Sequence, residues 1–467
     1  MKSFDQASTR LFSRRDLLAS SACGFGWLAG KSLLASSESG TKSPLPLPHY
    51  AAKAKRVIFL FMHGGPSPMD TFDYKPILNR DSGKPCPLPK PRVVSAETGN
   101  LLGSPFSFSQ KGQCGAWISE LFPHIGHIAD DLCFLHGMHG SNSRHGGALL
   151  ELHTGSDTFI RPSIGSWVSY GLGSECRDLP AFITLAPTLS HGGVNNQSSA
   201  FLPAVHQGVP IGSAATPADK ARIPYIEGGP SREAQRAQID LVNRLNTMHM
   251  NAAGPDSRLE AQIASMEMAF RMQATAPIVQ NLNQETKATQ EAYGLNDPTT
   301  QNYGKLCLMA RRFIESGVRF VQVSHSYKWD QHSNLKGDLT RNCKEVDQPI
   351  AALISDLKAR GLLEDTLVWW GGEFGRTPVA QGGDGRDHNP HGFTHFLAGA
   401  GVKPGFRYGG TDDYGYYAVD GKVHFHDLHA TILHLLGFEH TRLTYRHAGR
   451  DFRLTDIKGE LVKPILA

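Results

Sequence analysis

Two short stretches of the sequence combine carboxylates and imidazoles at a spacing that suits a metal ion. The segment WDQH places Asp330 and His332 two residues apart, so in an extended backbone both side chains point to the same side. The later segment GRDHNPH adds His388 and His391. Histidine and carboxylate ligands without thiolates suit zinc, manganese or iron. A single histidine of this kind is a hydrogen-bonded loop residue as often as it is a metal ligand. The rest of the sequence is therefore needed to choose between the two.

Four apolar segments of the sequence end in polar, glycine-rich stretches. These stretches are residues 63–73, 136–145, 325–332 and 371–391. The carboxyl ends of parallel strands lie along one edge of a sheet, which is where α/β proteins bind ligands. We therefore expect the four stretches to converge there. Two metal ions about 3.5–4 Å apart at such an edge would suit hydrolysis of phosphate or sulfate esters.

The apolar segments predict the sheet that would position these residues. Residues 56–62 form a continuous apolar run, which is typical of a strand buried on both faces. Further strands are expected at residues 132–135, 181–185, 318–323 and 366–370. Helices are expected at residues 118–131 and 346–361, the latter because its apolar residues recur at helical spacing. The alternation predicts an α/β fold with a mostly parallel central sheet flanked by helices on both faces.

Two other regions differ in character from this pattern. Between about residues 230 and 291, apolar side chains recur at i, i+4, i+7 and i+11, which predicts a helical insertion over the sheet. Near the start, Ser13-Arg14-Arg15-Asp16-Leu17-Leu18 precedes a modestly apolar run, as in a twin-arginine export signal. The alternative, a membrane anchor, is disfavoured because the run is short and glycine-rich. We expect a signal at 1–37, a linker at 38–55 and an α/β domain at 56–467.

Composition narrows the classes of function. The 467 residues carry a net charge of +4 and no basic run with interleaved aromatics, which argues against nucleic acid. Histidine occurs 22 times, roughly twice its ordinary share. The cysteines are scattered without a CxxC pair, and no GxGxxG follows the first strand. A thiolate zinc site and an oxidoreductase are therefore disfavoured.

Several spaced motifs resemble one bacterial family. They are HGGPSPMDTFD (63–73), SNSRHGGALLELHTG (141–155), WDQHSN (329–334), GGEFGRTP (371–378) and GRDHNPHGFT (385–394). The chain is similar in these motifs to the twin-arginine-exported family called domain of unknown function 1501, which is abundant in Planctomycetes. The resemblance covers nearly all of the chain after the signal. It implies the fold of the alkaline phosphatase and sulfatase superfamily, with a metal site at the sheet edge.

The resemblance also implies roles for individual positions. The metal ligands it indicates are His63 or Asp70, Asp330 with His332, Glu373, and His388. The nucleophile segment of the superfamily falls on residues 141–145, which makes Ser141, Asn142 and His145 the catalytic candidates. That segment lacks cysteine, so a formylglycine sulfatase is disfavoured. Phe374 stands where a metal-binding histidine is expected, which leaves the second metal open. Arg376 could bind a substrate anion or pair with a carboxylate.

Two functions follow from these expectations. The first is an exported hydrolase, periplasmic or at the cell surface, that uses one or two zinc, manganese or iron ions. Its substrate would be a phosphate or sulfate ester of a small molecule or a polysaccharide, and its partner the twin-arginine export machinery. The alternative is a non-catalytic exported protein that keeps the fold for surface binding or assembly. Phe374 and the absence of a clear nucleophile favour this alternative.

Overall fold

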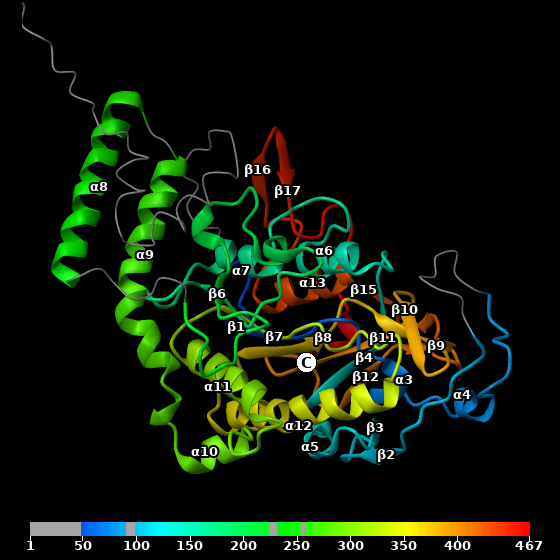
Figure 1. The fold of residues 1–467 in the computed structure, drawn as a ribbon. Helices are drawn as coiled ribbons and strands as arrows, with labels where there is room; N and C mark the ends of the chain where they lie inside the picture. The colour runs from blue at the N-terminus through cyan, green and yellow to red at the C-terminus, as the bar shows by residue number, and fades with distance from the viewer. Residues whose placement is uncertain (1–47, 90–98, 224–230, 255–256) are drawn as a thin grey trace, which may run out of the picture.

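A computed structural model describes residues 48–89, 99–223, 231–254 and 257–467 (Figure 1). The twin-arginine signal expected at 1–37, and residues 38–47 of the expected linker, lie outside these described residues. Residues 48–55 of the linker lie against the C-terminal part of the chain. The backbone N–H groups of His49 and Tyr50 both donate to the carbonyl of Gly437, at 2.8 and 3.3 Å.

A nine-stranded sheet forms the centre of the molecule, in the order β12-β4-β11-β8-β1-β7-β5-β6, with β15 beside β4. The strand β1 (Arg56–Met62) lies between β7 (Phe320–His325) and β8 (Thr366–Gly371) and runs parallel to both. Beyond β7, β5 (Phe182–Leu185) and β6 (Val209–Ile211) continue the parallel arrangement. The predicted α/β fold with a mostly parallel sheet is confirmed.

The other half of the sheet contains one reversed strand. The strand β11 (Phe393–Ala398) is antiparallel to β8 and also to β4 (Leu132–His139), so β4 again runs in the direction of β8. The short strands β12 (Phe406–Tyr408) and β15 (Val423–His424) are parallel to β4. The carboxyl ends of β1, β4, β5, β7 and β8 therefore lie along one edge of the sheet.

Helices cover both faces of the sheet (Figure 1). Side chains of β1 alternate between two cores, with Ile58, Leu60 and Met62 in one and Val57 and Phe59 in the other. The first core contains residues of α11 (Gln301–Glu315) and α12 (Leu335–Ala359); the second contains residues of α6 (His145–Thr154), α7 (Ile164–Leu172) and α13 (Phe425–Leu435). Each such buried side chain contributes about 1.5–3 kcal/mol, which explains the continuous apolar run of β1.

The expected helix at 118–131 was wrong as a single element. The structure has the strand β3 (Ala116–Ser119), the helix α5 (Pro123–His127) and a 3₁₀ turn at Ala129–Asp131. The strand β3 pairs with β2 (Phe108–Lys111) in a hairpin. Pro123 lacks a backbone N–H and is tolerated in the first turn of a helix but not in its interior, so α5 begins at this residue.

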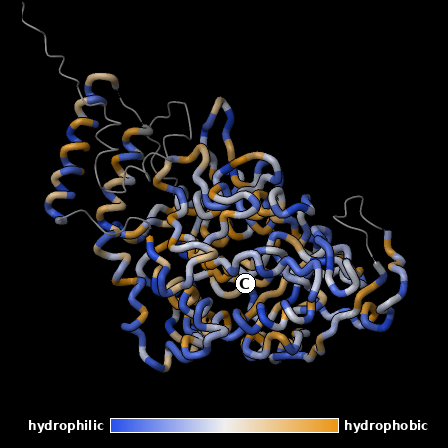
Figure 2. The backbone as a smooth tube through the Cα atoms, in the orientation of Figure 1, coloured by the Kyte–Doolittle hydropathy of each residue, from blue (hydrophilic) through white to orange (hydrophobic). Residues whose placement is uncertain are grey.

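The insertion region contains two long helices, α8 (Arg232–Ala253) and α9 (Ser257–Gln280), followed by the short helix α10 (Lys287–Ala292). The first two project to one side of the sheet (Figure 1). Arg236 links them through Glu267 at 2.6 Å. Apolar residues remain along α8 (Figure 2), where Met248 is 67% exposed. No helix in the described part of the chain is long and apolar enough to span a membrane.

A hairpin continues the chain beyond β8 at the sheet edge. Its strands are β9 (Gly375–Gln381) and β10 (Gly385–Asn389), paired antiparallel. From β10, Arg386 reaches Asp70, which lies in the short helix α3 (Pro68–Thr71). The guanidinium donates to both carboxylate oxygens, at 2.7 and 3.1 Å, and both side chains are fully buried. This ion pair connects the β9–β10 hairpin to the segment that follows β1.

The substitution Asp70→Asn is therefore expected to destabilise the fold strongly. It leaves the buried Arg386 charge without its partner, a loss that typically costs about 3–5 kcal/mol. Urea denaturation of the purified protein measures the change. Asp338→Asn is the matched control because Asp338 pairs with the exposed Arg341 at 2.8 Å, and exposed pairs contribute about 0–1 kcal/mol. Equal losses in the two variants would contradict this assignment.

Candidate metal centre

One carboxylate oxygen forms the centre of the polar cluster at the sheet edge. Asp330 lies in the loop after β7, and its Oδ1 is 3.3 Å from His145 Nε2, 2.9 Å from His332 Nε2 and 3.1 Å from His388 Nε2. Arg376 donates to the same oxygen at 2.6 Å. The imidazoles come from α6, from the loop after β7 and from β10. Three of the stretches expected to converge do so here.

These side chains lie close enough together to hold a cation. One ligand atom from each of His145, Asp330, His332 and His388 lies within 4.8 Å of the others. The far ring nitrogens are already engaged. His388 Nδ1 donates to the carbonyl of Ser143 at 2.8 Å, and His332 Nδ1 bonds the side-chain oxygen of Gln381. Such outer contacts fix the tautomer, so the Nε2 lone pairs face the shared space, as in metal sites.

A second group shares His145 and includes His63 and His191. His63 is fully buried, and neither of its ring nitrogens has a hydrogen-bond partner among the described residues. Burial lowers the pKa of His63 to about 4, so its imidazole is neutral and keeps a free lone pair. Its Nε2 lies 4.0 Å from a carboxylate oxygen of Glu373. A buried, unpartnered imidazole facing a carboxylate fits a cation ligand.

Glu373 is fully buried at the end of β8. Its two carboxylate oxygens accept from the N–H of Gly64 at 3.0 and 3.1 Å, and one lies 2.7 Å from His145 Nδ1. Burial alone would raise its pKa, but the contact with His145 outweighs this and the pKa falls to about 2. A side chain at Gly64, where φ is +120°, would clash with the backbone of Asp330. The contacts with Gly64 and His145 thus fix the position of the Glu373 carboxylate beside the cluster.

Phe374 occupies space between the imidazoles. Its ring stacks on that of His388, with centroids 4.5 Å apart and planes at 27°, and lies 4.9 Å from that of His145. The phenyl ring is almost fully buried. It therefore supports the orientation of the two histidines without offering a ligand atom.

Arg376 pairs with a carboxylate in this structure. Its side chain is fully buried and donates to the carbonyls of Gly65 at 3.0 Å, Arg386 at 3.2 Å and Trp329 at 3.1 Å, in addition to Asp330. Its donors are thus occupied by the protein itself. The guanidinium fixes the position of the Asp330 carboxylate.

Three residues singled out from the sequence make their contacts elsewhere. Asp70 is paired with Arg386, and that pairing takes it out of the candidate ligand set. The hydroxyl of Ser141 lies 3.0 Å from His424 Nε2. The side chain of Asn142 accepts from the N–H of Arg144 at 2.9 Å, just before α6 begins. Of the three catalytic candidates in this segment, His145 is the one whose side chain reaches the Asp330 cluster.

The sequence interpretation missed two residues at the cluster. His191 follows β5 in a Ser-His-Gly-Gly stretch, the same signal that identified the other strand ends, so it could have been found. Tyr327 donates its hydroxyl to Asp330 Oδ2 at 3.0 Å and had no such signal. Both have positive φ, at 50° and 49°. Tyr327 is 45% exposed and His191 is exposed, so the cluster is open on this side and buried at Glu373 and His63.

The chain belongs to the family described as Protein of unknown function (DUF1501), whose model matches residues 54–466. This match confirms the family resemblance inferred from the motifs. No protein in the curated set matches the chain.

Solved structures with a similar arrangement include three enzymes. The PsFucS1 sulfatase from Pseudoalteromonas sp. is 13% identical, with a TM-score of 0.36, over 98% of this chain and 76% of that one. The lipoteichoic acid synthase LtaP from Listeria monocytogenes is 12% identical, with a TM-score of 0.35, over 93% and 80%. The alkaline phosphatase from the Antarctic bacterium TAB5 is 10% identical, with a TM-score of 0.34, over 83% and 99%.

The contacts of His145 predict how the stability of the metal-free protein depends on pH. Burial opposes protonation, but hydrogen bonds to Asp330 and Glu373 outweigh it and raise the pKa of His145 to about 9. The unfolded value is about 6.5, so the contribution is complete below that pH and is lost as pH rises through 9. We expect the free energy of unfolding to fall by up to about 3 kcal/mol across this range.

Denaturant titrations between pH 6 and 9.5, in the presence of a chelator, measure this change. The variant His145→Gln should show a much smaller decline, because it has no proton to lose. A wild-type stability that stays level from pH 6.5 to 9 would contradict the protonated His145 of this arrangement.

Proposed function

We propose that this protein is an exported metal-dependent hydrolase of phosphate or sulfate esters. The observation that carries the proposal is the buried imidazole of His63, unpartnered among the described residues, beside Glu373 and the Asp330 cluster. Burying an unpaired polar ring is costly, and a bound cation would remove that cost. The resemblance to the alkaline phosphatase and sulfatase superfamily in the sequence motifs supports the same reaction class.

Two cation positions fit the residues present. Asp330, His332 and His388 would hold the first, and His63, Glu373 and the exposed His191 would hold the second. His145 belongs to both groups and lies between them. This set supports a second cation despite Phe374, because its two imidazoles come from the ends of β1 and β5. Nitrogen and carboxylate ligands without sulfur suit zinc, manganese or iron.

The bound cations would supply Lewis-acid polarisation of the ester and an activated water. The side chains of the protein position this chemistry. Arg376 and Tyr327 hold the two oxygens of Asp330, and Gly64 holds both oxygens of Glu373. The ester would approach from the exposed side, at Tyr327 and His191. The buried side, at His63 and Glu373, keeps bulk water from the ligands. The lower dielectric there strengthens the electrostatic attraction between ligand and cation.

The central test compares metal content and ester hydrolysis in variants of the full chain. The wild type should retain one or two zinc, manganese or iron ions and hydrolyse 4-nitrophenyl phosphate or sulfate. In Asp330→Asn and His332→Ala the metal content should fall and the rate should drop by roughly 100-fold. His249→Ala is the matched control because His249 lies on α8, away from the cluster. Elemental analysis and release of 4-nitrophenol provide the two readouts.

The outcome also decides between the hydrolase and the non-catalytic alternative. The contact of Ser141 with His424 favours the alternative, since it directs this candidate nucleophile away from the cluster. A folded wild type that binds metal but hydrolyses neither ester nor a sulfated or phosphorylated polysaccharide would support a binding role. A wild type without metal would contradict both cation positions.

Export by the twin-arginine route to the periplasm or the cell surface is part of the proposal. Replacing Arg14 and Arg15 with lysine should leave the full chain in the cytoplasm, because the arginine pair is the feature that the export machinery reads. Cell fractionation followed by immunoblotting measures the distribution. Export of the double variant at the wild-type level would contradict this route.

A further inference from the structure

A separate cluster of possible ligands lies between α6 and α13. One ligand atom from each of Glu151, His424 and His426 lies within 4.8 Å of the others. Glu151 is on α6, His424 caps the amino end of α13, and His426 is in the first turn of that helix. None of these residues belongs to the Asp330 cluster. The proposed hydrolysis makes no use of them.

The carboxylate in this cluster is buried and charged. Glu151 is 2% exposed. One of its oxygens accepts from the N–H of Ser141 at 2.8 Å, and the other lies 3.3 Å from His424 Nε2. The hydroxyl of Ser141 lies 3.0 Å from the same nitrogen. A carboxylate, a hydroxyl and an imidazole nitrogen thus lie close together, with Glu151 buried and Ser141 on the exposed side.

The two imidazoles face each other through nitrogens that both lack a proton when the rings are neutral. His426 Nε2 donates to the carbonyl of Gly155 at 2.9 Å, which leaves Nδ1 as the lone-pair nitrogen. The Nδ1 of His424 accepts from the backbone N–H of His426 at 3.3 Å, so it also presents a lone pair. These two Nδ1 atoms are 2.7 Å apart. Two facing lone pairs repel unless a proton or a metal ion lies between them.

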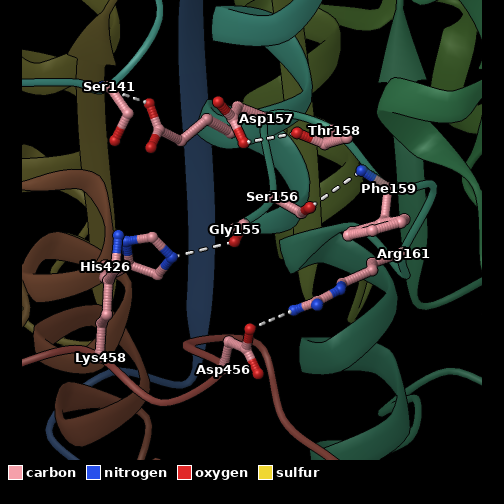
Figure 3. Close-up of a pocket in the computed structure, with 11 residues that line it drawn as sticks. Ser141, Gly155, Ser156, Asp157, Thr158, Phe159, Arg161, His426, Asp456 and Lys458 are labelled. Carbon is pink, nitrogen blue, oxygen red and sulfur yellow. Dashed lines mark hydrogen bonds and ion pairs between the residues drawn. The ribbon is translucent and has the colours of Figure 1, made fainter.

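We propose that Glu151, His424 and His426 bind a divalent zinc-type cation distinct from those of the Asp330 cluster. Two imidazoles and one carboxylate make a ligand set that zinc uses in sites with an open fourth position. The cluster also adjoins open space. Ser141, Glu151 and His426 line a cavity of about 180 Å³, in which Ser141 and His426 are seen at one end (Figure 3). The cavity leaves room for water or a small ligand at the fourth position.

The position of this cation would connect it to the Asp330 cluster. Four residues after Ser141, the chain reaches His145, and the carbonyl of Ser143 accepts from His388. A cation held by Glu151 and His424 would fix Ser141, through its N–H and hydroxyl contacts, at the start of this segment. The Glu151 site is therefore expected to fix the loop that carries His145 into the Asp330 cluster.

Cobalt binding tests the proposal on the full chain. Metal-stripped protein is titrated with cobalt chloride, and bound cobalt is counted by elemental analysis after removal of the excess. We expect Glu151→Gln and His426→Gln to bind one ion fewer per chain than the wild type. Asp330→Asn should retain this ion while losing the ion held by Asp330, His332 and His388. His249→Gln, on α8, should match the wild type.

The result separates this site from the proposed hydrolase. One cobalt ion fewer per chain in Asp330→Asn/His426→Gln than in Asp330→Asn supports the Glu151 site whether or not any ester is hydrolysed. Wild-type stoichiometry in both Glu151→Gln and His426→Gln would overturn it, because the facing nitrogens would then share only a proton. Circular dichroism checks the fold of each variant. If Glu151→Gln fails to fold, the His426→Gln variant decides the question, since it keeps the contact between the Glu151 carboxylate and Ser141.

Discussion

The polar edge of the sheet is organised around the charge on one oxygen of Asp330. Three imidazole nitrogens and one guanidinium lie within 3.3 Å of that atom. A partly buried carboxylate needs a hydrogen-bond donor or a cation beside it, and the four groups around Asp330 each come from a different element of the fold. Arg376 donates in turn to four backbone carbonyls, so the position of its guanidinium is fixed. The strands β1, β7 and β8 must therefore end at the same level, as their parallel register provides.

The strands and their common edge could be predicted because continuous apolar runs and polar strand ends are local signals. The Asp330, His332 and His388 positions followed from them, and the ligand role of Glu373 came from the family resemblance. Asp70 had the right chemistry for a ligand, but its partner Arg386 is 316 residues away, and only the folded chain shows that its charge is already neutralised. The same holds for Ser141, whose contact His424 lies at the start of a distant helix.

The helix α6 lies between the two clusters. His145 at its start faces the Asp330 group, and Glu151, six residues later, faces His424 and His426. Six residues turn an α-helix by about 240°, so the two side chains leave it in different directions. One short helix thus contributes to both groups. Gly155, the left-handed residue that ends α6, also accepts from His426. The two clusters are therefore connected by the ten residues of this helix.

Anomalous diffraction from crystals of the full chain, grown with zinc and measured at the zinc edge, tests the central claim most directly. We expect a peak within about 2.0–2.2 Å of ligand atoms from Asp330, His332 and His388. Its presence would mean that the convergence on Asp330 serves to bind a cation. The account would be contradicted by the absence of any peak there, with Asp330 neutralised only by Arg376 and a protonated His145.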